Sequence, residues 1–148
     1  MKQEDRELLF KDLCGRLPYG VKCLVNYTIC NETTDYEDVK SSTVDTLVTI
    51  NQQTESYFFE WLCEWFDFDE FKPYLFPLSS MTEKQKKEFS LITCDLNDSD
   101  YWRDGNMIYV DDKYQLNDII DFYHKNHLDY RGLIEKEMAN DATGKNIY

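Results

Sequence analysis

Residues 21–29 read VKCLVNYTI, and apolar and polar side chains alternate along the whole stretch. Every second side chain from Val21 to Ile29 is apolar and would lie on one face, while most of the others are polar. An alternation with a period of two is typical of a strand with one buried face. The same alternation returns in residues 44–50, so the sequence predicts two strands joined by a polar, acidic loop or hairpin connection over 31–43.

Sequence patterns typical of helices occur before the first of these strands and after the second. Residues 3–14 carry apolar side chains spaced four apart, and Gly15 is the predicted helix end. Ser80 and Glu83 have the spacing of a capping box, in which each side chain bonds the backbone of the other, so a helix is predicted to begin there. Residues 73–78, with two prolines, are predicted to be extended.

The C-terminal third continues this mixture. A helix is predicted over 117–127 with Asn117 as its cap, and a short one near 133–140. Residues 107–110 predict a short strand after a polar loop over 95–106. The fold class expected from these elements is α+β, with a small, mainly antiparallel sheet packed with about three to four helices. A single compact domain is expected over all 148 residues.

Acidic residues outnumber basic ones, 29 against 16, which makes the net charge −13. The aromatic share of 16% excludes a disordered acidic tail, and a pI of about 4.4 argues against direct binding to nucleic acid. Residues 31–71 hold eleven acids and one base, and residues 95–121 hold eight acids and two bases. If the two intervals lie close in the fold, they form one strongly negative face.

Several classes of protein chemistry lack their sequence signals. There is no signal peptide and no run of 18 apolar residues, so a cytoplasmic protein without membrane contact is expected. The five cysteines contain no CxxC pair, and Cys14 and Cys23 are predicted to be small core residues. No glycine-rich phosphate loop occurs. We therefore predict no cofactor, no metal and no catalytic residue.

Residues 56–71, SYFFEWLCEWFDFDEF, combine aromatic and acidic side chains and fit a helix and a strand equally well. The stretch is interpreted either as core, because aromatics cover small sheets, or as an exposed patch for a protein partner or a second copy. Trp61 and Trp65 distinguish the two, because exposure of more than a third of each favours the patch. The candidate binding residues are Glu60, Trp61, Glu64, Trp65, Asp67, Asp69, Glu70, Asp98, Asp100 and Asp104.

His124 and His127 lie three residues apart on the predicted helix, a spacing that can hold a divalent metal. With no other histidine in the chain, two structural imidazoles are the preferred interpretation. Arg131 is predicted to pair with Asp129 or with an acid that lines the core, and so to hold the C-terminal segment. The alternative is that Arg131 forms an anion or partner site.

Three blocks, LLFKDLCGRLPYGVKC (8–23), KPYLFPLSSMTEKQKKE (72–88) and HLDYRGLIEKEMANDATGKNIY (127–148), occur in order and cover about a third of the chain. Together they resemble a family of small proteins from gut anaerobes of the Bacteroides group, often found in their prophages and other mobile elements. The resemblance implies a bacterial or phage origin and no particular activity. Both acidic intervals lie almost entirely between the blocks.

These observations favour an interaction protein that binds a basic protein partner, because opposite charge accelerates association. One alternative is a DNA mimic that inhibits a host DNA-binding or defence protein. Another is a small enzyme with a carboxylate or histidine site, which would need a deep pocket with converging polar groups. Homo-oligomerisation is left open.

Overall fold

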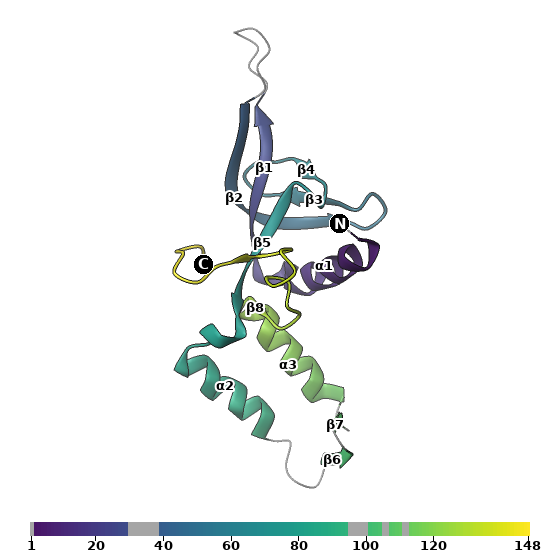
Figure 1. The fold of residues 1–148 in the computed structure, drawn as a ribbon, viewed down its shortest axis with the longest axis vertical. Helices are drawn as coiled ribbons and strands as arrows, with labels where there is room; N and C mark the ends of the chain where they lie inside the picture. Colours follow the sequence, from purple (N-terminus) through teal and green to yellow (C-terminus); the bar gives the residue numbers. More distant parts are fainter. Residues whose placement is uncertain (1, 30–38, 95–100, 105–106, 111–112) are drawn as a thin grey trace.

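The fold of the computed structural model is drawn in Figure 1, and the structure describes residues 2–29, 39–94, 101–104, 107–110 and 113–148. The α+β class is confirmed in this part of the chain. Its helices are α1 (Gln3–Arg16), α2 (Glu83–Cys94) and α3 (Lys113–Lys125), with short 3-10 turns at Leu17–Tyr19 and Leu78–Ser80.

The main sheet has the order β4-β3-β2-β1-β5-β8, and β9 also pairs with β5. Its long strands are antiparallel, whereas the two-residue strands β8 and β9 run parallel to β5, so the sheet is mixed and larger than predicted. A separate hairpin consists of β6 and β7. The strands are β1 Lys22–Ile29, β2 Val39–Asn51, β3 Ser56–Phe59, β4 Trp65–Phe66, β5 Phe71–Pro77, β6 Tyr101–Asp104, β7 Met107–Val110, β8 Leu128–Asp129 and β9 Asn140–Asp141.

The core lies between α1 and one face of the sheet. Leu9 and Leu13 of α1 are fully buried, and they belong to one cluster with the apolar face of β1 and the aromatic side chains of β3 to β5. Tyr57 and Phe59 both pack on Phe71, with ring centroids 4.8 and 5.2 Å apart. The alternation that predicted β1 therefore corresponds to real burial from Val21 to Val25, where aromatic rings supply much of the volume behind it, whereas Ile29 at the end of the strand is 46% exposed.

The β1–β2 ribbon is longer than the rest of the sheet. Val39 opposes Ile29 at its far end, so the first five residues of β2 belong to a strand, although they lie in the segment predicted as a loop or hairpin connection. Only Cys23, Leu24 and Val25 of β1 pair with β5. Figure 1 accordingly shows β1 and β2 rising together above the remaining strands.

The stretch 56–71 forms strands and turns, which removes the helical alternative. Tyr57 and Phe58 pair with Phe66 and Trp65 across the β3–β4 hairpin. A second correction concerns the loop predicted over 95–106, because Tyr101–Asp104 is strand β6. The predicted strand over 107–110 is confirmed as β7, and the extended segment over 73–78 lies largely in β5.

The predicted helix ends need correction. Gly15 lies inside α1, which runs on to Arg16. The capping box at α2 involves Thr82 and Gln85, not Ser80 and Glu83: the Gln85 N–H donates to Thr82 Oγ1 (3.2 Å), and the Thr82 N–H donates to Gln85 Oε1 (2.8 Å). The same physical device therefore operates two residues later than predicted.

The helix over 117–127 is α3, but it begins at Lys113, so Asn117 lies in its interior and does not cap it. It ends at Lys125, and His127 follows with a positive φ of 52°. The short helix predicted near 133–140 is absent from this described segment, which forms turns.

Helices α2 and α3 pack on each other at the lower end of the molecule in Figure 1. Phe89 of α2 contacts Phe122 and Tyr123 of α3, with ring centroids 5.3 and 5.5 Å apart. Gln85 donates to Asn126 Oδ1 at 3.0 Å. Among the described residues, no helix has both the length and the apolar character that crossing a bilayer requires.

Candidate functional site

Two tryptophans are exposed to solvent, Trp61 in the turn between β3 and β4 and Trp65 at the start of β4. Trp61 is 70% exposed and Trp65 is 50% exposed, both well above a third. The ring of Trp65 packs against the ring of Phe58 on the neighbouring strand β3, with ring centroids 5.3 Å apart. Large side chains exposed in this way cost solvation free energy, and their usual use is contact with another molecule. The exposure favours the patch interpretation for the two tryptophans. The core interpretation holds for other aromatic residues of the same stretch, because Tyr57, Phe59, Phe66, Phe68 and Phe71 are buried.

A buried carboxylate holds the turn in place. Asp45 of β2 is only 5% exposed, and its oxygens accept hydrogen bonds from the backbone N–H groups of Trp61 (3.1 Å), Leu62 (2.9 Å) and Thr46 (2.6 Å). The turn closes when the Cys63 N–H donates to the Phe59 carbonyl at 3.1 Å. A carboxylate that accepts several N–H groups forms strong, charge-assisted bonds, so the position of Trp61 follows from Asp45.

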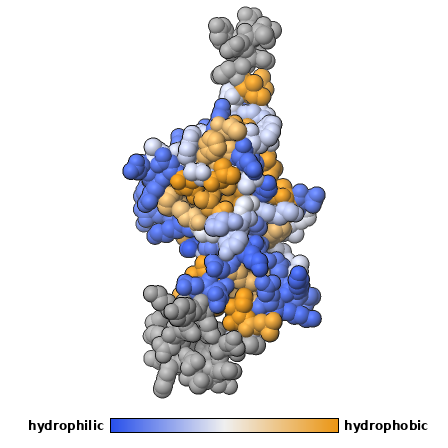
Figure 2. Space-filling model, turned by 180° about the vertical axis from the view of Figure 1, so that it is seen from behind, coloured by the Kyte–Doolittle hydropathy of each residue, from blue (hydrophilic) through white to orange (hydrophobic). Residues whose placement is uncertain are grey.

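Apolar exposure continues from the tryptophans onto the sheet. Asp45 and Leu47 point into the core, so Val44 lies on the opposite face of β2 and is 42% exposed. Val48, at the irregularity in the β2–β3 register, is 40% exposed. Figure 2, which shows the molecule from behind, has hydrophobic residues gathered at the height of these strands. This face of the sheet is therefore only partly covered by polar side chains.

Exposed carboxylates flank the tryptophans in the sequence. The five acidic residues of the interval 31–71 that were predicted to bind a partner are all exposed, namely Glu60, Glu64, Asp67, Asp69 and Glu70. Of these five, Asp69 alone forms an ion pair within the described part of the chain, with Arg6 at 3.5 Å. Glu70 accepts the backbone N–H of Asp67 at 2.8 Å, which orders the approach to β5. All seven candidate residues of this interval are thus exposed within residues 60–70, a stretch that we call the tryptophan–acid patch.

The second acidic interval does not join this patch in the part that the structure describes. Asp98 and Asp100 lie outside the described residues, as does the side chain of Asp104 on β6. Asp118 and Asp121 are exposed on α3. In Figure 1, α3 lies in the lower half of the molecule, whereas β3 and β4 lie in the upper half, beside the lower part of the β1–β2 ribbon. The expected merger of the two intervals into one negative face is therefore not seen among the described carboxylates.

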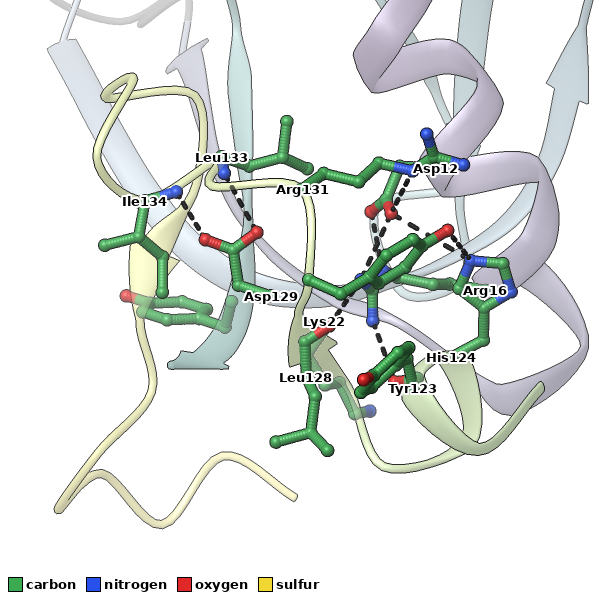
Figure 3. A network of polar contacts seen from close by, with 12 residues as sticks. Asp12, Arg16, Lys22, Tyr123, His124, Leu128, Asp129, Arg131, Leu133 and Ile134 are labelled. Carbon is green, nitrogen blue, oxygen red and sulfur yellow. Dashed lines mark hydrogen bonds and ion pairs between the residues drawn. The ribbon is translucent and has the colours of Figure 1, made fainter. Parts of the chain in front are cut away.

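A second polar cluster, buried between α1, α3 and the C-terminal segment, has a different character (Figure 3). Asp12 and Arg16 form an ion pair with both side chains fully buried, at 2.6 Å. Arg16 also donates to the Leu128 carbonyl at 2.8 Å, and Arg131 approaches Asp12 Oδ1 at 3.2 Å. Arg131 therefore pairs with an acid that lines the core, one of its two predicted partners.

The histidines belong to this buried region. His124 Nε2 lies 2.9 Å from the Tyr130 hydroxyl and 4.0 Å from Asp12 Oδ1. Burial lowers the pKa of His124, and it lowers the pKa of His127 to about 4. In both cases the positive charge of Arg16 is the second cause. His127 stacks on Tyr148 with ring centroids 3.9 Å apart. Both imidazoles are therefore neutral at pH 7 and packed on tyrosine rings, as structural histidines are.

Two further contacts close this region. A Cβ at Gly15 would lie within 2.8 Å of His124 Nε2, so only glycine permits α3 to approach α1 this closely. Asp129 accepts the backbone N–H groups of Leu133 (2.9 Å) and Ile134 (2.8 Å), which leaves its carboxylate bound to the chain that follows and not to Arg131. The cluster thus joins three segments of the chain and has the features of a scaffold.

The sequence analysis did not identify the buried charged residues Asp12, Arg16 and Asp45. Leu9, Asp12, Leu13 and Arg16 have the spacing i, i+3, i+4, i+7 of one helix face, and all four are buried. An acid and a base four apart on an apolar stripe are the signal that could have identified the pair. Asp45 carried a weaker signal, as one acid at an inward position of an alternating strand. Cys23 is buried as expected, whereas Cys14 is exposed.

Comparisons of the chain with models of protein families, with curated proteins and with solved structures found no match. The resemblance of the three blocks to proteins of the Bacteroides group stays a prediction.

Proposed function

We propose that the protein is a non-enzymatic interaction protein whose tryptophan–acid patch binds a basic protein partner. The observation that carries the proposal is the exposure of two tryptophans: Trp61 (70%) lies on a turn that the buried Asp45 holds in position, and Trp65 (50%) begins β4 directly after that turn. Tryptophans are frequent among the residues that dominate binding energy in protein interfaces. A turn fixed before binding loses little conformational entropy when a partner arrives.

The charges around the tryptophans indicate the chemistry of the partner. Glu60 and Glu64 flank Trp61 in sequence, and both are exposed. With a net charge of −13, the protein attracts cationic surfaces over a range set by the ionic strength. Lysine and arginine side chains on a partner would meet these carboxylates at the rim, and arginine would also stack on the indole rings. A bacterial or phage origin, and a place in the cytoplasm, remain part of the proposal.

Affinity capture with matched baits tests the function. The wild-type protein, Trp61→Ala/Trp65→Ala and Glu60→Gln/Glu64→Gln are immobilised and exposed to extracts at low salt, and retained proteins are identified by mass spectrometry. We expect wild-type bait to retain a basic protein that both variants lose at least tenfold. Leu91→Ala is the control, because Leu91 is 72% exposed on α2, far from the patch.

Salt separates the proposed mode from other kinds of binding. Screening shortens the range of charge interactions to about 3 Å at 1 M salt, so the basic partner should elute there. Retention that survives 1 M salt, or that is the same for all four baits, contradicts the proposal. The alternatives of a DNA mimic and of a small enzyme stay predictions, because no described feature favours either over a protein-binding surface.

A further inference from the structure

The hydrogen-bond pattern of the β1–β2 ribbon shows which backbone groups face outward. The Leu47 N–H donates to the Val21 carbonyl at 3.1 Å, and these two residues stand directly opposite each other in the register that pairs Lys22 with Thr46. Opposed residues in an antiparallel pair alternate between bonding each other and pointing their N–H and C=O groups away. The intervening pairs of the ribbon, including Leu24 with Val44, therefore point their groups outward.

Two observed bonds agree with this pattern. The outward carbonyl of Thr46 on β2 accepts the Glu60 N–H at 3.0 Å, and the outward N–H of Asn26 on β1 donates to the Glu70 carbonyl at 2.7 Å. Beyond Glu60 the chain leaves β2, because the N–H groups of Trp61 and Leu62 bond the Asp45 carboxylate instead.

That departure leaves an open edge on β2. The outward N–H and C=O groups of Lys40, Ser42 and Val44 have no hydrogen-bond partner among the residues that the structure describes. Trp61 and Glu60 stand where the open edge begins, next to Thr46 and Asp45. Unpaired strand edges readily bind another extended chain, and a two-stranded ribbon has little stability of its own.

We propose that this open edge, residues 40–44 of β2, receives an extended basic segment of the partner as an added strand. The inference rests on the proposed function and specifies its geometry: backbone hydrogen bonds to Lys40, Ser42 and Val44 supply affinity, and Trp61 and Glu60 contact the end of the added strand. A basic segment fits because residues 31–71, the interval that includes β2, carry eleven acids and one base. Addition of a second copy would bring two chains of −13 together.

A defined probe tests the geometry separately from the function. The probe is a fluorescent eight-residue peptide of alternating lysine and valine, and its control is the same peptide with every backbone nitrogen methylated. Both carry the same charge and side chains, but the control has no N–H to donate. Fluorescence anisotropy at low salt should show at least tenfold weaker binding of the methylated peptide. Equal binding of both peptides overturns strand addition and leaves the proposed function intact, whereas binding of neither contradicts both.

Ser42→Pro tests the edge from the side of the protein. Proline removes the outward N–H of Ser42 but breaks none of the bonds that join β2 to β1, and prolines are tolerated at such edge positions. We expect at least fivefold weaker peptide binding for Ser42→Pro and unchanged binding for Ser42→Ala. Amide exchange of the wild-type protein provides a readout that needs no variant: the peptide should slow exchange at Ser42 and Val44 at least tenfold. Unchanged exchange there, or a stable dimer that covers this edge, overturns the proposal.

Discussion

Asp12 and Asp45 are both buried aspartates, yet the regions around them differ in what they hold. Asp12 lies among cationic side chains, Arg16 and Arg131, and joins α1 to α3 and the C-terminal segment. Asp45 bonds backbone N–H groups and fixes a turn that carries an exposed tryptophan. The two carboxylates therefore differ in role: Asp12 joins elements of the scaffold, as the buried Asp129 also does through backbone N–H groups, whereas Asp45 holds a surface turn in the position that exposes Trp61.

The comparison predicts that Asp12→Asn has the largest effect on stability. The variant leaves Arg16, which is fully buried, without its counter-charge. Removing one partner of a buried ion pair lowers the free energy of unfolding by about 3–5 kcal/mol, because an uncompensated charge remains in the interior. Urea denaturation should show this loss, while Asp118→Asn, an exposed change on α3, should stay within about 0.5 kcal/mol of wild type. A loss below 1 kcal/mol for Asp12→Asn would contradict the scaffold role.

The same region should make stability depend on pH. Burial lowers the pKa of His127 to about 4 in the folded protein, so the unfolded chain binds more protons between that value and about 6.5. Stability is therefore highest above pH 6.5 and falls as the pH drops toward 4, by about 3 kcal/mol for this group at full effect. Thermal melts from pH 7.5 to 4 should show the decline.

His127→Asn identifies the source of that decline. Asparagine does not titrate in this range and tolerates the positive φ of this position, which is 52°. The variant should lose overall stability with its Tyr148 contact but show a flatter pH profile. A profile as steep as that of the wild type would assign the pH dependence to other groups.

The two regions also differ in how well sequence predicts them. The strand at Lys22–Ile29 was predictable because its alternation is long and each buried position carries an apolar side chain. The Asp12–Arg16 pair was missed: its spacing on an apolar stripe was a signal, but charged residues on a helix are normally solvated, and the contacts that bury these two come from Leu128 and Arg131, more than a hundred residues away. The tryptophan–acid patch lies between these cases: its residues were identified, but their exposure depends on the turn that Asp45 fixes.

The helix ends that were predicted wrongly can be explained by local contacts. Gly15 was predicted as a helix end from its usual role, but here it removes a side chain where His124 packs. Ser80 was predicted as a cap, but its hydroxyl donates to the Pro77 carbonyl at 2.8 Å, and Thr82 takes the capping position. In both cases the residue type was suited to two roles, and a tertiary contact or a preceding turn decided between them.

Asp45→Asn should have an intermediate effect that is concentrated at the patch. The amide keeps one acceptor oxygen but places an NH₂ group against backbone donors, which costs about 1–3 kcal/mol. Amide exchange of Trp61 and Leu62 should accelerate at least tenfold, while amides of α1 respond only to the global loss. Asp67→Asn, an exposed neighbour, is the matched control. Unchanged exchange at Trp61 would show that the turn holds without this carboxylate.

Trp61→Ala should change folding stability least, by about 0.5 kcal/mol or less, because most of its side chain already contacts water. The same variant is expected to lose partner binding at least tenfold, so stability and binding should separate at this residue and not at Asp12. Urea denaturation and peptide anisotropy on the same preparations measure both quantities. A stability loss above 2 kcal/mol would mean that Trp61 contributes to the core after all, and the distinction between a cohesive and a presenting region would fail at its most exposed residue.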